Sequence, residues 1–140
     1  IRIGRAIYEK DFEEMEKNIS DYLLKTASYY DTADEAFYQG LVLGLCAILN
    51  KRYDVLSNRE SGLGRFDIQL FPRISGLPGF IFELKIAENS KSDLERKATE
   101  ALKQISDKKY DTELKKRGVK SIIKIGMAFH GKNAIVKKEI

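Results

Sequence analysis

The sequence predicts an α/β domain in which helices flank one central mixed β-sheet. Hydrophobic residues make up 43% of the 140 residues and charged residues 33%, a balance typical of one globular domain with its own core. The apolar pattern switches between helical and strand periods in the order α-α-β-β-β-α-α-β-β. Helical crossovers join parallel strands and short turns join antiparallel ones, so this order predicts a sheet that contains both.

We expect a single domain over residues 1–140, because a chain of this length leaves little room for two. An N-terminal helix is expected in 1–30, since apolar residues recur at helical spacing over 11–28. The core of the domain should occupy 33–140. The chain begins with Ile1 rather than Met, which indicates a piece of a longer protein.

A second helix is expected at 33–51, where Thr32 and Glu35 have the spacing of a capping box. This helix is apolar nearly all round, which is typical of a helix buried on most sides. Gly40 and Gly44 lie four residues apart on one face and should let another backbone approach closely.

The rest of the sequence predicts five strands and two further helices. Runs rich in β-branched and aromatic residues are bounded by Gly- and Pro-containing turns, as is typical of strands. Two helical patterns separate the third strand from the fourth. We expect strands at 53–58, 65–71, 79–86, 121–129 and 134–139, and helices at 92–106 and 108–117.

Charge is distributed unevenly along the chain. Residues 1–50 carry five Lys/Arg and nine Asp/Glu, a net charge of −4, whereas residues 91–140 carry fourteen and seven, a net charge of +7. A basic C-terminal half suggests an anionic partner, with nucleic acid as the first candidate. Lysines that only solvate helix faces would give the same pattern, and charge alone does not decide between the two.

The few Cys and His residues limit the kinds of site. Cys46 is the one cysteine of the sequence and lies in an apolar run, which is typical of a buried thiol in a reducing, cytoplasmic compartment. With one Cys and one His130, a zinc site of the Cys/His type is excluded, and we expect a structural role for His130. The longest apolar run, 41–49, is too short for a bilayer, which needs about 20 residues, so no membrane contact is expected.

The chemistry is expected on two strands that a short loop joins. Side chains alternate along a strand, so Glu83 and Lys85 emerge on one face of 79–86, away from its Phe and Leu residues. If 65–71 pairs with this strand in the antiparallel sense, the symmetric register places Asp67 directly opposite Glu83, about 4.5–5.5 Å away at Cβ.

Two carboxylates at that separation repel each other unless a divalent cation lies between them. Asp67, Glu83 and the main-chain carbonyl of Leu84 would then ligate Mg²⁺ (or Mn²⁺). Lys85 beside the metal would orient or deprotonate the attacking water during hydrolysis of a phosphodiester. The alternative is structural, a buried ion pair of Lys85 with one of the carboxylates.

These residues resemble the PD-(D/E)XK nuclease superfamily. The strings GRFD (64–67) and FELK (82–85) are similar to its D…(D/E)-x-K signature, with Phe66 in the place of the proline. Over 33–136 the sequence resembles the branch found C-terminal to an ATPase-like domain in bacterial proteins. The resemblance implies a restriction-endonuclease-like α-β-β-β-α-β core, a divalent metal cofactor and an ATPase-like neighbour in the full-length chain.

The resemblance also implies a further metal ligand outside the strand pair. Glu35 has the position of an acidic ligand on the first core helix, and its capping box is the alternative reading. Gln39, one turn later, stands where relatives of the wider group carry His. Glu60, in the Gly-rich corner before the Asp67 strand, is a second candidate, or else a turn carboxylate that accepts from nearby amides.

Gln104 and Tyr110 resemble the Q…Y element that follows the E-x-K strand in many of these nucleases, with a spacing of six residues instead of four. We expect a catalytic role for Gln104 and contacts with nucleic acid for Tyr110, Lys97 and Lys108. The alternatives are a solvent-facing helix position for Gln104 and ordinary surface positions for the lysines.

We therefore expect a metal-dependent nuclease that hydrolyses the phosphodiester bonds of nucleic acid, with DNA as the first candidate. The alternative is a catalytically silent nuclease-like module that binds nucleic acid or its ATPase-like neighbour. A nucleotide-binding enzyme is not supported, because the sequence has no G-x-x-x-x-G-K-[ST] loop.

Overall fold

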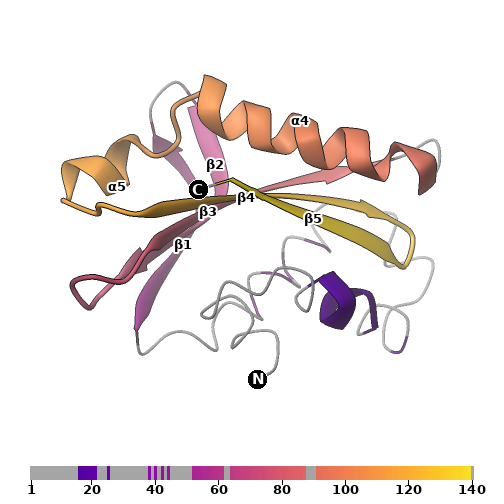
Figure 1. Ribbon diagram of the computed structural model, residues 1–140, viewed down its shortest axis with the longest axis horizontal. Coiled ribbons are helices and arrows are strands. Elements are labelled where there is room, and N and C mark those ends of the chain that lie inside the picture. The colour runs from indigo at the N-terminus through magenta and orange to yellow at the C-terminus, as the bar shows by residue number, and fades with distance from the viewer. Residues whose placement is uncertain are drawn as a thin grey trace.

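In a computed structural model of the chain, a five-stranded sheet lies between helical segments on its two faces (Figure 1). The structure describes residues 16–21, 25, 38, 40, 42, 44, 52–61, 64–87 and 91–139, without the side chains of 58–61, 64–66 and 91. The strands are β1 (Tyr53–Ser61), β2 (Gly64–Pro72), β3 (Gly79–Ile86), β4 (Ile122–His130) and β5 (Asn133–Glu139). Between β3 and β4 the chain forms the helices α4 (Leu94–Asp107), which follows a 3₁₀ turn at Lys91–Asp93, and α5 (Thr112–Lys116).

The five strands lie side by side in the order in which they occur in the chain. β3 and β4 run parallel and are joined by the crossover that contains α4 and α5, whereas the other neighbouring strands run antiparallel. This mixed sheet confirms the predicted fold class. α5 is shorter than the helix expected at 108–117, because the chain turns at 108–111 before it becomes helical again.

The face of the sheet away from α4 is apolar. Side chains alternate along a strand, so every second residue of the central strands points to this face. β3 and β4 are buried on both faces. In Figure 1 the helical residues 16–21 lie below the sheet, whereas α4 and α5 lie above it. The buried side chains on the lower face are Ile19, Tyr38, Val42, Tyr53, Ile68, Leu70, Phe80, Phe82, Leu84, Ile123, Ile125, Met127, Phe129, Ala134 and Val136.

Tyr38 attaches the N-terminal part to the sheet. Its ring stacks on Phe129 with the centroids 4.3 Å apart, and its hydroxyl donates to the carbonyl of Gly131 at 2.7 Å. Tyr38 and Val42 are buried, but Gly40 and Gly44 are exposed, and a Cβ at either glycine would meet no atom within 4 Å. The expected close backbone approach at these two glycines is therefore wrong, because they lie on the side of the helix away from the sheet.

The close approach occurs instead between α4 and β4. A Cβ at Gly126 would lie 2.4 Å from the carbonyl oxygen of Ala98 and 2.9 Å from the main-chain nitrogen of Leu102. Only glycine fits there, so Gly126 sets the distance between α4 and the sheet. Since Gly126 pairs with Glu83 of β3, this approach also brings α4 over the part of β3 that carries charge.

Candidate functional site

β3 carries two charged side chains on the face that α4 covers. Glu83 is only 5% exposed, and its Oε2 lies 3.9 Å from Lys85 Nζ. The Lys85 side chain is 30% exposed, whereas the Glu83 side chain beside it is buried. Ionised groups are rarely buried in this way unless a partner compensates for the lost hydration.

Asp67 reaches the same place from β2. The two strands pair with Ile68 opposite Phe82, so the next position of this register sets Asp67 against Glu83. There the Asp67 Oδ2 accepts a hydrogen bond from the main-chain N–H of Leu84 at 2.8 Å. This bond holds the Asp67 carboxylate against β3, next to the paired residues of the two strands. The structure thus brings Asp67, Glu83 and Lys85 together. We refer to Asp67 and Glu83 as the carboxylate pair.

The two carboxyl groups are close enough for each to affect the ionisation of the other. Burial raises the pKa of Asp67 above its ordinary value of 3.8, although the hydrogen bond from Leu84, the charge of Lys85 and a hydrogen bond with the Glu83 side chain all lower it. Two carboxyl groups can form a hydrogen bond only if they share a proton. A divalent cation can take the place of that proton, and it would remove the repulsion between the carboxylates.

Two hydrogen bonds connect Lys85 to the end of α4. Lys85 Nζ donates to Gln104 Oε1 at 2.5 Å, and Gln104 Nε2 donates to the Tyr110 hydroxyl at 3.0 Å. These bonds use both ends of the Gln104 amide, so its carbonyl is held toward Lys85. Gln104 therefore contacts the ammonium group directly, as a role at the site requires and a purely solvent-facing helix position does not.

Tyr110 reaches Gln104 because of the way in which α4 ends. Lys109 has a positive φ of 55°, its N–H bonds to the carbonyl of Ser106 (3.2 Å), and the N–H of Tyr110 bonds to the carbonyl of Ile105 (3.1 Å). These two bonds define a Schellman motif, in which the residue after the left-handed position folds back onto the helix. Because the chain folds back, Tyr110 contacts Gln104 although the two residues are six apart. In a continuous helix, residues four apart would make such a contact.

The Tyr110 side chain is buried at the edge of the site. The residue is 2% exposed and packs with Ile81, Ile105 and Leu114. Burial raises the pKa of its hydroxyl above the ordinary 10.0, and the charges of Glu83 and Asp67 raise it further, although the bond from Gln104 lowers it. The hydroxyl is therefore within electrostatic reach of the carboxylate pair. Its direct contact with nucleic acid stays a prediction.

The carboxylate pair provides two of the oxygen ligands that Mg²⁺ prefers, and the main-chain carbonyl of Leu84 stays a predicted third. Within the described ranges, no group of three or more His, Cys, Asp and Glu side chains is placed to hold a metal. The predicted additional ligand Glu35, like Gln39, lies outside the described residues. Glu60 lies in β1 opposite Arg65, but its side chain is not described. These donors fit a cation that retains several waters, as Mg²⁺ commonly does.

The predicted nucleic-acid contacts lie on α4 and at its end. Lys97 Nζ lies 3.5 Å from Glu100, so its charge already has a partner. Lys108 is exposed and forms the C-cap of α4, with its N–H bonded to the carbonyl of Gln104 at 2.9 Å. His130 Nδ1 donates to the carbonyl of Ala87 at 2.5 Å, a contact that fits the structural role expected for it.

Gln69 lies on the same face of β2 as Asp67, and no role for it was expected from the sequence. It lies two residues after Asp67 on β2, is 1% exposed, and its Oε1 has no hydrogen-bond partner among the described residues. A buried amide oxygen normally has a donor, and an ordered water can supply one. The alternation of β2 already puts Gln69 on the side of Asp67, and the polar residue at a buried position was the available signal.

Comparison with known families identifies the class of protein. A family model of the PD-(D/E)XK nuclease superfamily matches residues 33–139, and the chain therefore belongs to this superfamily. Its members generally use divalent metal ions, and the superfamily implies a nucleic-acid substrate. A comparison with curated proteins finds no match. No helix in the described part of the chain is long and apolar enough to cross a membrane.

Proposed function

We propose that this chain is a metal-dependent nuclease that hydrolyses phosphodiester bonds of DNA. The observation that carries the proposal is the position of Asp67 opposite the buried Glu83 on neighbouring strands, with Lys85 Nζ 3.9 Å from the Glu83 carboxylate. A sheet interior does not need such a group of charges for stability, and replacing buried ion pairs with apolar residues is often neutral or stabilising. Perturbed pKa values and buried charge of this kind are typical of functional sites.

Each residue has a separate task in this proposal. Asp67, Glu83 and the main-chain carbonyl of Leu84 would hold Mg²⁺ or Mn²⁺, and the bound ion would stabilise charge on the phosphodiester. Lys85 would orient the attacking water, since its side chain is partly exposed and its ammonium group is held by Gln104. Gln104 in turn is held by the Tyr110 hydroxyl, so Tyr110 acts on the reaction by positioning. Glu35 remains a proposed further ligand.

The full-length protein is proposed to carry an ATPase-like domain before this one, and to act in the cytoplasm. The resemblance of residues 33–136 to the branch with that arrangement supports the first statement. A sequence with one cysteine in an apolar run supports the second.

A cleavage assay tests the proposed reaction. Single- and double-stranded DNA and RNA are incubated with the protein in Mg²⁺, Mn²⁺ or EDTA, and we expect cleavage of DNA that EDTA abolishes. Lys85→Ala should lower the rate about 10²–10⁴-fold and still show a melting temperature raised by Mg²⁺, because Lys85 is not a ligand. Asp67→Ala should lose cleavage and the effect of Mg²⁺ together. Lys103→Ala, at an exposed position paired with Asp107, is the control and should match the wild type.

A catalytically silent module that binds nucleic acid or an ATPase-like neighbour is the second candidate. Its support is that the described residues include two acidic side chains at the site and no third. This candidate predicts binding of DNA without cleavage in any metal. A wild type that does not cleave, and whose melting temperature does not respond to Mg²⁺ or Mn²⁺, would decide for it and against the nuclease.

A further inference from the structure

Most of the basic residues of the C-terminal half fall into two groups. Those of α4 and β5 largely face carboxylates, which neutralise them locally and leave little attraction for a polyanion. The exposed α4 cations Arg96 and Lys103 belong to this group, as does Lys137 of β5. The ion pairs are Arg96–Glu100 (2.7 Å), Lys103–Asp107 (3.7 Å) and Lys137–Glu95 (3.8 Å).

The connection from α4 to β4 carries the second group, and we call residues 108–120 the basic connection. One of its cations, Lys115, pairs with Asp111 at 3.0 Å. Its other five cations are exposed and form no ion pair within the described ranges of the chain. These are Lys108, Lys109, Lys116, Arg117 and Lys120.

The basic connection extends from the catalytic site toward the opposite end of the sheet. At its first end Lys108 bonds through its N–H to Gln104, the residue that holds Lys85. At its last end Lys120 precedes Ser121, whose carbonyl accepts the N–H of Gly79 at the start of β3 (2.8 Å). From Gly79 to Lys85 the strand rises about 20 Å, at about 3.3 Å per residue.

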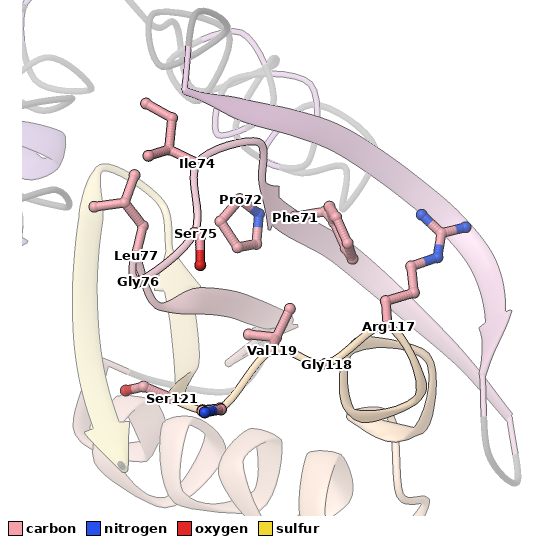
Figure 2. Close-up of a pocket in the computed structure, with 11 residues that line it drawn as sticks. Phe71, Pro72, Ile74, Ser75, Gly76, Leu77, Arg117, Gly118, Val119 and Ser121 are labelled. Carbon is pink, nitrogen blue, oxygen red and sulfur yellow. The ribbon is translucent and has the colours of Figure 1, made fainter.

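A pocket lies at the far end of the basic connection. Figure 2 shows it between the loop that joins β2 to β3 and the turn that leads into β4. Its volume is about 450 Å³, and both Arg117 and Lys120 line it. The Arg117 guanidinium lies 4.9 Å from the centroid of the Phe71 ring, which also lines the pocket. Cations beside aromatic and apolar surface are typical of surfaces that follow a nucleic-acid strand.

We propose that the basic connection is a second contact surface for the nucleic-acid substrate, which holds the phosphates on one side of the cleaved bond as far as the pocket. The proposal rests on the proposed nuclease function and assigns the partner surface of that site. Unpaired cations favour a polyanion, because each phosphate they neutralise releases condensed counterions. A reach of about 20 Å corresponds to about six nucleotides at 3.4 Å each.

Two variants with equal net charge test the proposal. Lys116→Gln/Arg117→Gln/Lys120→Gln removes three unpaired cations, and Arg96→Gln/Lys103→Gln/Lys137→Gln removes three paired ones, so each lowers the net charge from +4 to +1. Binding of a fluorescent 20-base-pair duplex is measured in EDTA between 50 and 200 mM salt, settings at which the counterion effect is large. The first variant should lower the slope of log K against log salt by about 2.7, and affinity by at least about tenfold at 100 mM. The control should change the slope by less than about one.

Substrate length gives an independent readout. Wild-type affinity should rise as the duplex is lengthened to about six nucleotides from the cleavage point and then level off, and the unpaired-cation variant should lack this rise. Equal slopes for the two variants, or a length dependence that the first variant retains, would overturn the proposal while leaving nuclease activity intact. A wild type that binds an acidic peptide and no nucleic acid would overturn it together with the proposed function.

Discussion

The two faces of β3 are both covered, yet only one of them carries charge. On the lower face Phe80, Phe82 and Leu84 lie in a continuous apolar cluster with residues of β2, β4 and the N-terminal part. On the α4 face the same strand presents Glu83 and Lys85 after Ile81, and both charged residues take part in the polar contacts of the site.

The difference shows that the charges are not required by the fold. The lower face demonstrates that this strand can be stabilised by apolar packing alone, which contributes about 1.5–3 kcal/mol for each fully buried large side chain. The carboxylate pair, of which Glu83 is buried and Asp67 partly buried, opposes folding in the absence of a cation, because burial already raises the pKa of Asp67. The α4 face therefore retains groups that are best explained by chemistry, and substitutions on the two faces should have opposite signatures.

The largest expected contrast is between Phe82→Ala and Lys85→Met. Phe82 is fully buried in the lower cluster, so its truncation should lower the free energy of unfolding by about 3–5 kcal/mol. Lys85→Met keeps the length of the side chain and should leave the stability within about 1 kcal/mol, while cleavage falls about 10²–10⁴-fold. Chemical denaturation and a cleavage assay on both variants check this. If Lys85→Met unfolds the protein, the charged face is structural and the contrast fails.

Gly126→Ala should disturb the site from a distance. The added methyl group would clash with the backbone of α4 at Ala98 and Leu102, so the helix must move away from the sheet. We expect a loss of about 1–3 kcal/mol in stability and reduced cleavage, because α4 carries Gln104. Gly40→Ala is the matched control: it lies in a helix, exposed and with nothing within 4 Å, and should stabilise the protein by about 0.5–1 kcal/mol. Full activity in a folded Gly126→Ala would show that cleavage does not depend on the distance between α4 and the sheet.

Asp67→Asn should reverse its effect on stability when metal is added. Because the pKa of Asp67 is raised in the folded state, its favourable contribution is present below pH 3.8 and is lost as the pH rises through the raised value. At pH 7 without metal, Asn should therefore raise the melting temperature by about 2–4 °C, the change that about 1 kcal/mol produces in a domain of this size. Asn can still accept the Leu84 N–H.

The same variant should lose the stabilisation that Mg²⁺ gives to the wild type, and its advantage should disappear below pH 3.8. Thermal melts at three pH values with and without Mg²⁺ provide the measurement. An Asn variant that is less stable than the wild type at pH 7 in EDTA would show that Asp67 is a stabilising ion-pair partner.

The sequence predicted the strands and the convergence of Asp67, Glu83 and Lys85, because alternation along two strands and a short loop between them leave few other registers. It did not locate the close approach of α4, since several glycines have the same local properties and only the packed helix distinguishes Gly126 from Gly40. The resemblance singled out Gln104 and Tyr110 at an unusual spacing, but it did not predict the contact between them. A Schellman motif with lysine at its left-handed position has no clear sequence signal, since glycine is the residue that usually marks it.

The smallest expected effect concerns that lysine. Lys109 adopts φ 55°, a region in which a Cβ is unfavourable by about 1–2 kcal/mol, and glycine has no such penalty. Lys109→Gly and Lys109→Ala both remove the charge, so the difference between them isolates the backbone. We expect the Gly variant to be more stable than the Ala variant by about 1 kcal/mol, with cleavage closer to that of the wild type, because the turn holds Tyr110 against Gln104. Both should lower the salt slope of DNA binding by about 0.9, the contribution of one cation. Equal stability and activity in the two variants would mean that the turn does not position Tyr110. Gln104 would then be the last residue of the α4 face that acts on Lys85.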